Sequence, residues 1–304
     1  MRILFSILCC VFAFAGQAQE NDNSSQQEII YGHKDGLAMT MIMLQPASGS
    51  NGKAIVDVVS GNWISSYKYA EFGTKQSSTY LSKGYTVFLV MHGSQPRFTI
   101  DEALSDLKRA VRFVRYHASE YKIDPDHIGI TGASSGGHLS LLVGLTDTKT
   151  DSLSTDPVDK VSSRVQAVAV FFPPTDFLNY GAAGFNPTKQ QEMMKNFGVA
   201  AAFDFKKWDK QKQEFIPYTM EEKQALAKEL SPVYAVTKDD PPVFIVHGDA
   251  DMVVPLQQST SLTDKLKATD VKTELVVKKG AGHGWENPGP EKQQFVSWFD
   301  KYLK

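Results

Sequence analysis

A serine in a glycine-flanked turn is the first candidate for chemistry in this chain. The apolar residues 128–130 are typical of a strand, residues 132–137 of a tight turn, and residues 138–145 of a buried helix. Ser134 lies inside this turn in the pattern Gly-x-Ser-x-Gly, in which small neighbours let a strand and a helix meet at a sharp corner. We therefore expect the Ser134 hydroxyl to project above the edge of a sheet and to act as a nucleophile.

A base and an acid must accompany that serine. A hydroxyl is a weak nucleophile until a base takes its proton, and the base needs an acid to fix its tautomer. His283 lies in a glycine-flanked loop after the last predicted strand, so we predict that it is the base. We predict Asp251 as the acid and interpret Asp249 as a turn residue that bonds its own backbone. The order serine, acid, histidine is one in which such triads occur.

The other polar residues near these motifs receive structural interpretations. His247 precedes both aspartates and is interpreted as a packing or turn residue, and His138 as a satisfied core histidine. The pair Asp249 and Asp251 lacks the further ligands that a metal site requires.

Backbone N–H groups must also stabilise the negative charge that develops on an attacked carbonyl oxygen. The N–H of Ser135, at the start of the predicted helix, is one expected donor. A second set follows the buried strand predicted at residues 54–59, in the sequence Ser-Gly-Asn-Trp at residues 60–63. We predict that Gly61 and Asn62 complete the oxyanion hole, and the alternative is an ordinary Gly-Asn turn.

The elements around these motifs alternate between strands and helices. Several apolar runs are nearly continuous, which indicates strands that are buried on both faces, as in a parallel sheet. A capping box at Thr99 and Glu102 opens one helix, and Asp35-Gly36 is typical of a hairpin turn between two opening strands. The sequence predicts an α/β fold with a mainly parallel central sheet flanked by helices. The predicted strands are 29–31, 39–44, 54–59, 84–91, 128–130, 165–171, 242–247 and 273–277, and the predicted helices are 67–81, 103–114, 138–145, 256–266 and 290–303.

Residues 177–231 interrupt this alternation. They contain no convincing strand, many aromatic residues and a helix that begins at Thr219 with Glu222 as its capping partner. An insertion of this length lies over the ligand-binding edge of an open α/β sheet, so we predict a small helical cap. The alternative is that its aromatic residues bury only the insertion's own core.

The motifs together resemble the α/β-hydrolase superfamily over residues 27–304. Within it the chain is similar to secreted esterases related to acetylxylan and feruloyl esterases, the BD-FAE-like group, and to the hormone-sensitive-lipase-like group. Relatives show HGGGW at this loop, and here Val59 replaces the histidine, Ser60 the first glycine and Asn62 the third glycine. These changes keep the backbone donors but alter the loop. Relatives also show alanine where this chain has Ser135. The motifs that carry the resemblance are SGNW, HGSQPRFTIDEALSDLKRAVRFVR, GASSGGH, FFPPTD, HGDADMVVP and GAGHGW.

The resemblance implies a serine carboxylesterase that acts through an acyl-enzyme, without a cofactor or metal, on a small or polysaccharide-linked ester of acetyl or feruloyl type. Trp63, Pro174 and Trp285 are the candidate substrate contacts that it suggests. Two alternatives are a peptidase similar to prolyl oligopeptidase, which shares the HGDADMVVP style of motif, and a binding protein with an inactive triad.

Composition indicates the compartment and excludes some partners. The 304 residues are 42% hydrophobic and 22% charged with a formal net charge of −2, which is ordinary for a globular protein and gives no nucleic-acid surface. Residues 1–18 are typical of a signal peptide cleaved before Gln19, and no other apolar run approaches membrane-spanning length. Both cysteines, Cys9 and Cys10, lie in this leader. We expect export to the periplasm or the extracellular space, without disulfides in the mature chain.

Overall fold

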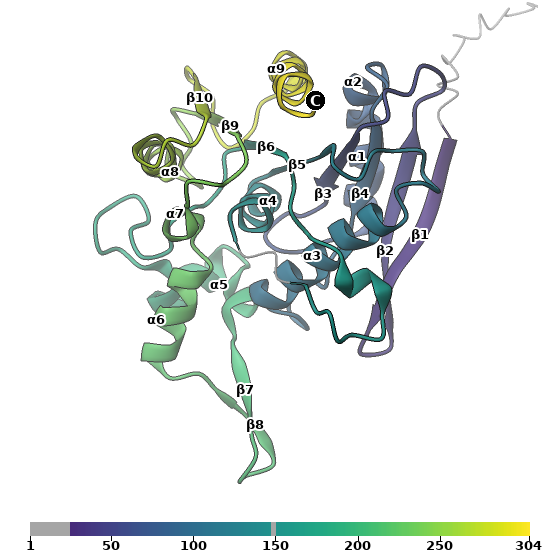
Figure 1. Ribbon diagram of the computed structural model, residues 1–304. Helices are drawn as coiled ribbons and strands as arrows, with labels where there is room; N and C mark the ends of the chain where they lie inside the picture. Colours follow the sequence, from purple (N-terminus) through teal and green to yellow (C-terminus); the bar gives the residue numbers. More distant parts are fainter. Residues whose placement is uncertain (1–24, 147–149) are drawn as a thin grey trace, which may run out of the picture.

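A computed structural model describes residues 25–146 and 150–304, so the predicted signal peptide at residues 1–18 lies outside the described residues. In this part of the chain an eight-stranded sheet has the order β1-β2-β4-β3-β5-β6-β9-β10 (Figure 1). Strand β2 pairs antiparallel with β1 and β4, and the remaining pairs are parallel. The strands are β1 Ser25–Lys34, β2 Leu37–Gln45, β3 Ala54–Val58, β4 Thr86–Val90, β5 Ile128–Ala133, β6 Ala167–Phe171, β9 Val243–Gly248 and β10 Thr273–Lys278.

The predicted mainly parallel sheet is therefore confirmed. The turn at Asp35 and Gly36 has φ angles of 48° and 76°, which is the left-handed backbone that a two-residue hairpin requires. Strand β5 extends to Ala133 and the helix after it begins at Ser135, so the predicted turn at residues 132–137 is tighter than expected.

Helices cover the two faces of the sheet separately. Helices α3, α4 and α8 cover one face, and α1, α2 and α9 cover the other (Figure 1). Helix α3 begins at the predicted capping box, where the Thr99 N–H donates to Glu102 Oε2 at 2.9 Å. The bounds are α1 Tyr67–Gln76, α2 Ser78–Leu81, α3 Ile100–Tyr116, α4 Ser135–Leu145, α8 Gln257–Ala268 and α9 Gly289–Tyr302, with a 3-10 turn at Pro157–Lys160.

The order of the strands reverses at β3. The chain leaves β3 through α1 on one face, returns as β4, and then places β5 on the opposite side of β3, from which α4 departs on the other face. The carboxyl ends of β3 and β5 are therefore a switch point, which is where open α/β sheets bind ligands. Both the serine corner and the Ser-Gly-Asn-Trp loop lie at this point.

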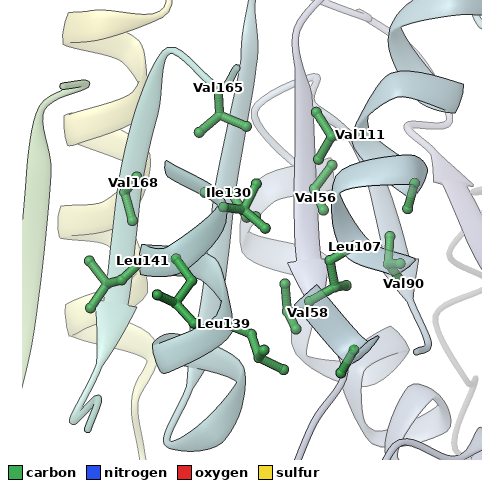
Figure 2. Close-up of a cluster of buried hydrophobic side chains, with 14 of the residues drawn as sticks. Val56, Val58, Val90, Leu107, Val111, Ile130, Leu139, Leu141, Val165 and Val168 are labelled. Carbon is green, nitrogen blue, oxygen red and sulfur yellow. The ribbon is translucent and has the colours of Figure 1, made fainter. Parts of the chain in front are cut away.

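A buried aliphatic core fixes the face that carries α3 and α4. Figure 2 shows valine, leucine and isoleucine side chains from β3, β4, β5 and β6 meeting those of α3 and α4. Each such side chain, when fully buried, stabilises the fold by about 1.5–3 kcal/mol. The labelled residues are Val56, Val58, Val90, Leu107, Val111, Ile130, Leu139, Leu141, Val165 and Val168.

The segment between β6 and β9 holds short elements and one small hairpin. Helix α6 begins after Thr219, and the predicted capping box with Glu222 is present. The prediction that residues 177–231 contain no strand is wrong, because β7 and β8 pair as a hairpin that extends away from the rest of the protein (Figure 1). The elements are η2 Pro187–Lys189, α5 Gln191–Asn196, η3 Ala200–Phe203, β7 Lys206–Asp209, β8 Glu214–Pro217, α6 Met220–Glu229 and α7 Pro232–Ala235.

The hairpin could not be predicted from the sequence because its strands lack the alternation of buried and exposed residues that identifies a strand. Each has four residues, nearly every one of which faces solvent, so an alternation of apolar and polar residues is absent. Its main contact between side chains is the pair Trp208 and Phe215, whose ring centroids are 5.2 Å apart.

In the described ranges, no helix is long and apolar enough to cross a lipid bilayer.

Candidate active site

Ser134 occupies a strained backbone corner between β5 and α4. Its φ of 54° and ψ of −121° lie in a region that residues with side chains rarely adopt. Gly132 and Gly136 make the corner possible. A Cβ atom on Gly136 would lie 2.6 Å from the Val58 carbonyl oxygen, and one on Gly132 would lie 2.6 Å from the Gly136 backbone. The predicted steric role of the two glycines is confirmed.

The structure brings the three predicted side chains together. His283 Nε2 lies 2.9 Å from Ser134 Oγ, and His283 Nδ1 lies 2.7 Å from Asp251 Oδ2. With Asp251 ionised, Nδ1 carries the proton and donates it, which leaves Nε2 to accept the serine proton. This is the arrangement that activates a serine nucleophile.

Four donors converge on the Asp251 carboxylate. Burial opposes its ionisation, but hydrogen bonds from His247 and His283 and from the amides of Val254 and Val253 outweigh this effect and hold the pKa of Asp251 well below its usual range. The side chain is fully enclosed. Asp251 is therefore a fixed negative charge beside His283.

Asp249 lies outside this network. Its Oδ1 accepts the Gly280 N–H at 2.6 Å, and its Oδ2 lies 3.2 Å from Lys279 Nζ. It therefore links two neighbouring loops, and its carboxylate also accepts a bond from its own backbone, as predicted for a turn residue. Across residues 25–146 and 150–304, no group of three or more His, Cys, Asp or Glu gathers as a metal ion would require.

His247 is a residue of the site whose role the sequence analysis missed. It is fully buried, and its Nε2 lies 2.9 Å from the Val254 carbonyl oxygen and 3.3 Å from Asp251 Oδ2. Both neighbours are acceptors, so Nε2 carries a proton, and Nδ1 accepts the Ser259 hydroxyl at 2.7 Å. His247 therefore donates to Asp251 Oδ2, the same carboxylate oxygen that His283 Nδ1 contacts. The signal in the sequence is a histidine four residues before the acid.

The oxyanion loop differs from the prediction at Gly61. Its N–H donates to the Ile64 carbonyl at 2.9 Å and the Ile64 N–H returns the bond, so Gly61 has no free donor. The two residues between them, Asn62 and Trp63, have φ angles of 52° and 55°, as in the tight turn of a hairpin. Gly61 is therefore replaced by Trp63 as a candidate donor.

Three backbone N–H groups remain beside the serine. Those of Asn62, Trp63 and Ser135 have no acceptor among the described residues, and all three residues line the cavity that contains Ser134. The Asn62 and Ser135 donors were predicted, and a turn with two left-handed residues presents the third. Unpaired amides next to a nucleophile can hold the oxyanion of a tetrahedral intermediate.

Polar contacts tie this loop to the insertion. The Asn62 side chain donates to the Phe197 carbonyl at 3.1 Å, and the Gln95 amide donates to Asn62 O at 2.6 Å and to Gly198 O at 2.9 Å. Gln95 Oε1 in turn accepts the Ala202 N–H at 3.1 Å. Gln95 is buried, so it fixes the oxyanion loop against the segment that contains α5.

Trp63 and His138 form the support of the loop. The Trp63 indole N–H donates to His138 Nδ1 at 3.1 Å, and His138 Nε2 donates to the Leu230 carbonyl at 2.8 Å. Burial lowers the pKa of His138 to about 4, so the ring is neutral. The prediction of a satisfied core histidine is confirmed, and the buried Trp63 indole stabilises the loop while its edge borders the cavity.

The cavity above Ser134 has a volume of about 260 Å³ and mainly apolar walls. Pro174, a predicted substrate contact, lines it together with Phe177. Some aromatic residues of the insertion therefore line the cavity, whereas Trp208 and Phe215 lie exposed in the hairpin. The insertion supplies Tyr180, Phe185, Pro187, Met193, Met194, Phe197, Val199 and Phe203, and the loop after β9 supplies Met252, Val253, Val254 and Pro255.

A larger cavity of about 610 Å³ lies on the other face of the switch point. The third predicted substrate contact, Trp285, lines this cavity and is absent from the lining of the one that holds Ser134. The reason is that Trp285 packs on Phe171 and Phe172, with ring centroids 5.7 Å from each. At the floor of this cavity lies Asp57, a lone acid in the middle of β3.

A sequence model of the BD-FAE family matches residues 41–266 of the chain. Among curated relatives, the probable carboxylic ester hydrolase LipM of Mycobacterium tuberculosis is 32% identical over 187 residues, which cover 60% of this chain and 38% of LipM. The esterase LipQ of the same organism is 27% identical over 222 residues, which cover 73% of this chain and 47% of LipQ. The chain thus spans less than half the length of these two relatives.

A solved structure described as a truncated carbohydrate esterase from gut microbiota matches with a TM-score of 0.73 and 26% identity, covering 93% of this chain and 98% of that one. The α/β-hydrolase fold predicted from the motifs is confirmed by this likeness.

We predict that His247→Phe, which removes the donor to Asp251, slows turnover while leaving substrate binding intact. Loss of a hydrogen bond to a charged group costs about 1.5–3 kcal/mol, so kcat should fall about tenfold to 100-fold. The pKa of Asp251 should rise because one donor is lost, and the acid limb of the pH–rate profile should move to higher pH. KM should change little, because His247 lines neither cavity.

The measurement is kcat and KM against pH, with a melting curve for each variant. His33→Phe, at an exposed position of β1, makes the same change away from the site and is the control. A lower melting temperature together with an unchanged pH profile would show that His247 is merely a core residue.

We also predict a pH-dependent stability change in Asp57→Asn. Burial raises the pKa of Asp57 from 3.8 to about 6, although Lys292 opposes the shift. Between about pH 4 and pH 6 the folded protein keeps a proton that the unfolded chain releases, so this group lowers stability as pH rises, by about 3 kcal/mol at most. Asparagine removes that loss. The variant should therefore gain stability relative to the natural protein from pH 4 to pH 7.

Urea unfolding of both proteins at pH 4.0, 5.5 and 7.5 measures this difference. Asp264→Asn, on the exposed face of α8, makes the same chemical change at the surface. A difference between Asp57→Asn and the natural protein that stays constant with pH would contradict the prediction.

Proposed function

The chain belongs to the BD-FAE family, and from this premise we propose that it is a serine carboxylic ester hydrolase acting through an acyl-enzyme on a small or carbohydrate-linked ester. The observation that carries the proposal is the hydrogen-bonded set of Ser134, His283 and Asp251 beside unpaired backbone N–H groups. The names of the relatives and of the solved carbohydrate esterase support the ester as the bond that is cleaved.

In the first half of the proposed reaction, Ser134 Oγ attacks the ester carbonyl carbon while His283 Nε2 takes the serine proton. Asp251 stabilises the imidazolium that forms and holds its orientation. The N–H groups of Asn62, Trp63 and Ser135 donate to the oxyanion. Collapse of the tetrahedral intermediate breaks the bond to the alcohol oxygen, which leaves with the proton from His283.

In the second half, a water molecule replaces the alcohol. His283 takes a proton from this water as its oxygen attacks the acyl carbon, and returns a proton to Ser134 Oγ as the acid leaves. The same three N–H groups serve both oxyanions, because the acyl carbon stays attached to Ser134 throughout.

The shape of the smaller cavity favours short or flat acyl groups. It holds about 260 Å³ between Ser134 and the insertion, below the range of about 300–1,000 Å³ typical of sites for drug-sized ligands. Phenylalanine and methionine side chains line it, so an apolar acyl group displaces water from apolar surface. We propose acetyl and other small or planar acyl groups as its occupants.

We further propose that the protein is exported. The support is the sequence of residues 1–18, with Arg2 before an apolar run and small residues at Gly16 and Ala18.

The proposed nucleophile is tested with Ser134→Ala. Removal of a triad serine should lower kcat for p-nitrophenyl acetate by on the order of 10⁴-fold or more, because no hydroxyl remains to form the acyl-enzyme. The measurement is release of nitrophenolate, and Ser297→Ala on the exposed face of α9 is the matched control. Equal rates in Ser134→Ala and the natural protein would exclude the proposed function.

The proposed export is tested by expressing the full sequence in a bacterial host and determining the N-terminus of the protein from each compartment. We expect a chain that begins at Gln19 in the periplasm or medium. Uncleaved protein confined to the cytoplasm would contradict the proposal.

A further inference from the structure

The larger cavity adjoins the catalytic residues on the side away from the insertion. Its walls include Ala133, which precedes Ser134, and Gly284, which follows His283. Phe172, also in the wall, has its ring centroid 4.6 Å from that of His283. Ser134 and His283, with their neighbours Ala133 and Gly284, therefore separate the two cavities, and we call these four residues the ridge. The mechanism derived above uses only one of them.

The floor of this cavity carries a carboxylate without a partner. Asp57 lies deep in the sheet on β3, yet part of its surface is open to the cavity. Among residues 25–146 and 150–304, no side chain or N–H group donates a hydrogen bond to it and no cation lies within ion-pair distance. A buried polar group without a hydrogen bond lowers the stability of the folded protein. Such a group is expected where a bound ligand supplies the missing hydrogen bond.

Lys292 provides a donor in the same cavity. Its Nζ donates to the Gln76 carbonyl at 2.9 Å and to Gln76 Oε1 at 3.1 Å, and an ammonium group has three N–H donors. Lys292 attracts Asp57 electrostatically without touching it. An added cation would be repelled by Lys292, so the cavity favours a neutral ligand that both donates and accepts hydrogen bonds.

The remaining walls suit the faces of a ring. Trp285 is partly exposed, Tyr69 is 44% exposed and Phe72 is 65% exposed, and all three line the cavity. A volume of about 610 Å³ lies within the range of about 300–1,000 Å³ for small-molecule sites. Apolar walls with a few polar groups at the floor would hold a ring that has C–H faces and hydroxyl edges.

The chemistry of the triad decides which part of the ester lies there. His283 Nε2 must reach the departing alcohol oxygen, whereas the oxyanion donors Asn62, Trp63 and Ser135 line the smaller cavity. Gly284 and Trp285, which follow His283 in the chain, line the larger cavity, so this cavity offers room for the alcohol part on the side of His283.

We propose that the larger cavity binds the alcohol part of the ester, as a ring that bears free hydroxyl groups, with Asp57 accepting a hydrogen bond from one hydroxyl and Lys292 donating to another. This inference rests on the proposed function, and it assigns Asp57 and Lys292 as the residues that select the alcohol part by its hydroxyl groups. After Ser134 Oγ has bonded to the acyl carbon, collapse of the tetrahedral intermediate breaks the bond from that carbon to the alcohol oxygen carried by the ring. The proton that His283 took from Ser134 passes to this oxygen, so the ring leaves as a neutral alcohol.

Recognition of the ring hydroxyl groups is measured by comparing two acetate esters whose six-membered rings have the same size. One is a methyl pyranoside carrying a single acetyl group, and the other is cyclohexyl acetate, which lacks the ring hydroxyls. We expect the natural protein to prefer the pyranoside in kcat/KM. In Asp57→Asn this preference should fall about tenfold, because the neutral amide oxygen still accepts the hydrogen bond but holds it about half as strongly as a carboxylate does.

Asp300→Asn is the matched control, because it makes the same change on the same face of the sheet and bonds only the Tyr85 hydroxyl outside the cavity. It should retain the preference of the natural protein. Folding of Asp57→Asn is checked by its melting curve. Direct binding is measured in Ser134→Ala by saturation-transfer NMR with the unacetylated methyl pyranoside, and we expect the signal to weaken when Asp57→Asn is added.

The outcomes separate this inference from the proposed function. A natural protein that cleaves p-nitrophenyl acetate, with the same pyranoside preference in Asp57→Asn, would overturn the alcohol site alone. Saturation transfer of equal strength with and without Asp57→Asn would also overturn it. Failure of the natural protein to cleave any of the three esters would overturn the proposed function itself.

Discussion

The backbone at Ser134 is the constraint on which the site depends. A side chain at a φ of 54° costs about 1–3 kcal/mol, and the corner persists because Gly132 and Gly136 let β5, α4 and the end of β3 approach within backbone contact. Neighbouring strands β3 and β5 then send their helices to opposite faces of the sheet. The nucleophile therefore stands at a ridge with one cavity on each side, and the positions of both cavities follow from the strand order.

The charge of Asp251 is held in place by two chains of hydrogen bonds that converge on its carboxylate. Ser259 donates to His247, His247 donates to Asp251, and His283 donates to the same carboxylate while accepting from Ser134. Each acceptor fixes the tautomer of its neighbour, so Asp251 stays charged and His283 keeps a free lone pair towards the serine. A second, looser polar pair, Asp57 and Lys292, lies on the far side of the ridge.

The sequence was sufficient for features set by local pattern. Apolar runs identified each strand of the large sheet, and glycine spacing identified the corner at Ser134. It failed where a contact depends on distant parts of the chain. The N–H of Gly61 was predicted as an oxyanion donor, but the turn folds back and this N–H donates to the Ile64 carbonyl. Asp57 is a lone acid within the run Ala-Ile-Val-Asp-Val, and apolar periodicity alone does not show that it borders the larger cavity.

The central claim is that the hydroxyl at position 134, and no other, is activated. Reaction of the folded protein with a fluorophosphonate, followed by peptide mass mapping, tests it most directly because the neighbouring Ser135 hydroxyl is an internal comparison, 3.0 Å from Ser60 Oγ and away from His283. The account predicts one phosphonyl group per chain, on Ser134, and loss of labelling after heat unfolding. An unlabelled folded protein, or a label on Ser135, would contradict it.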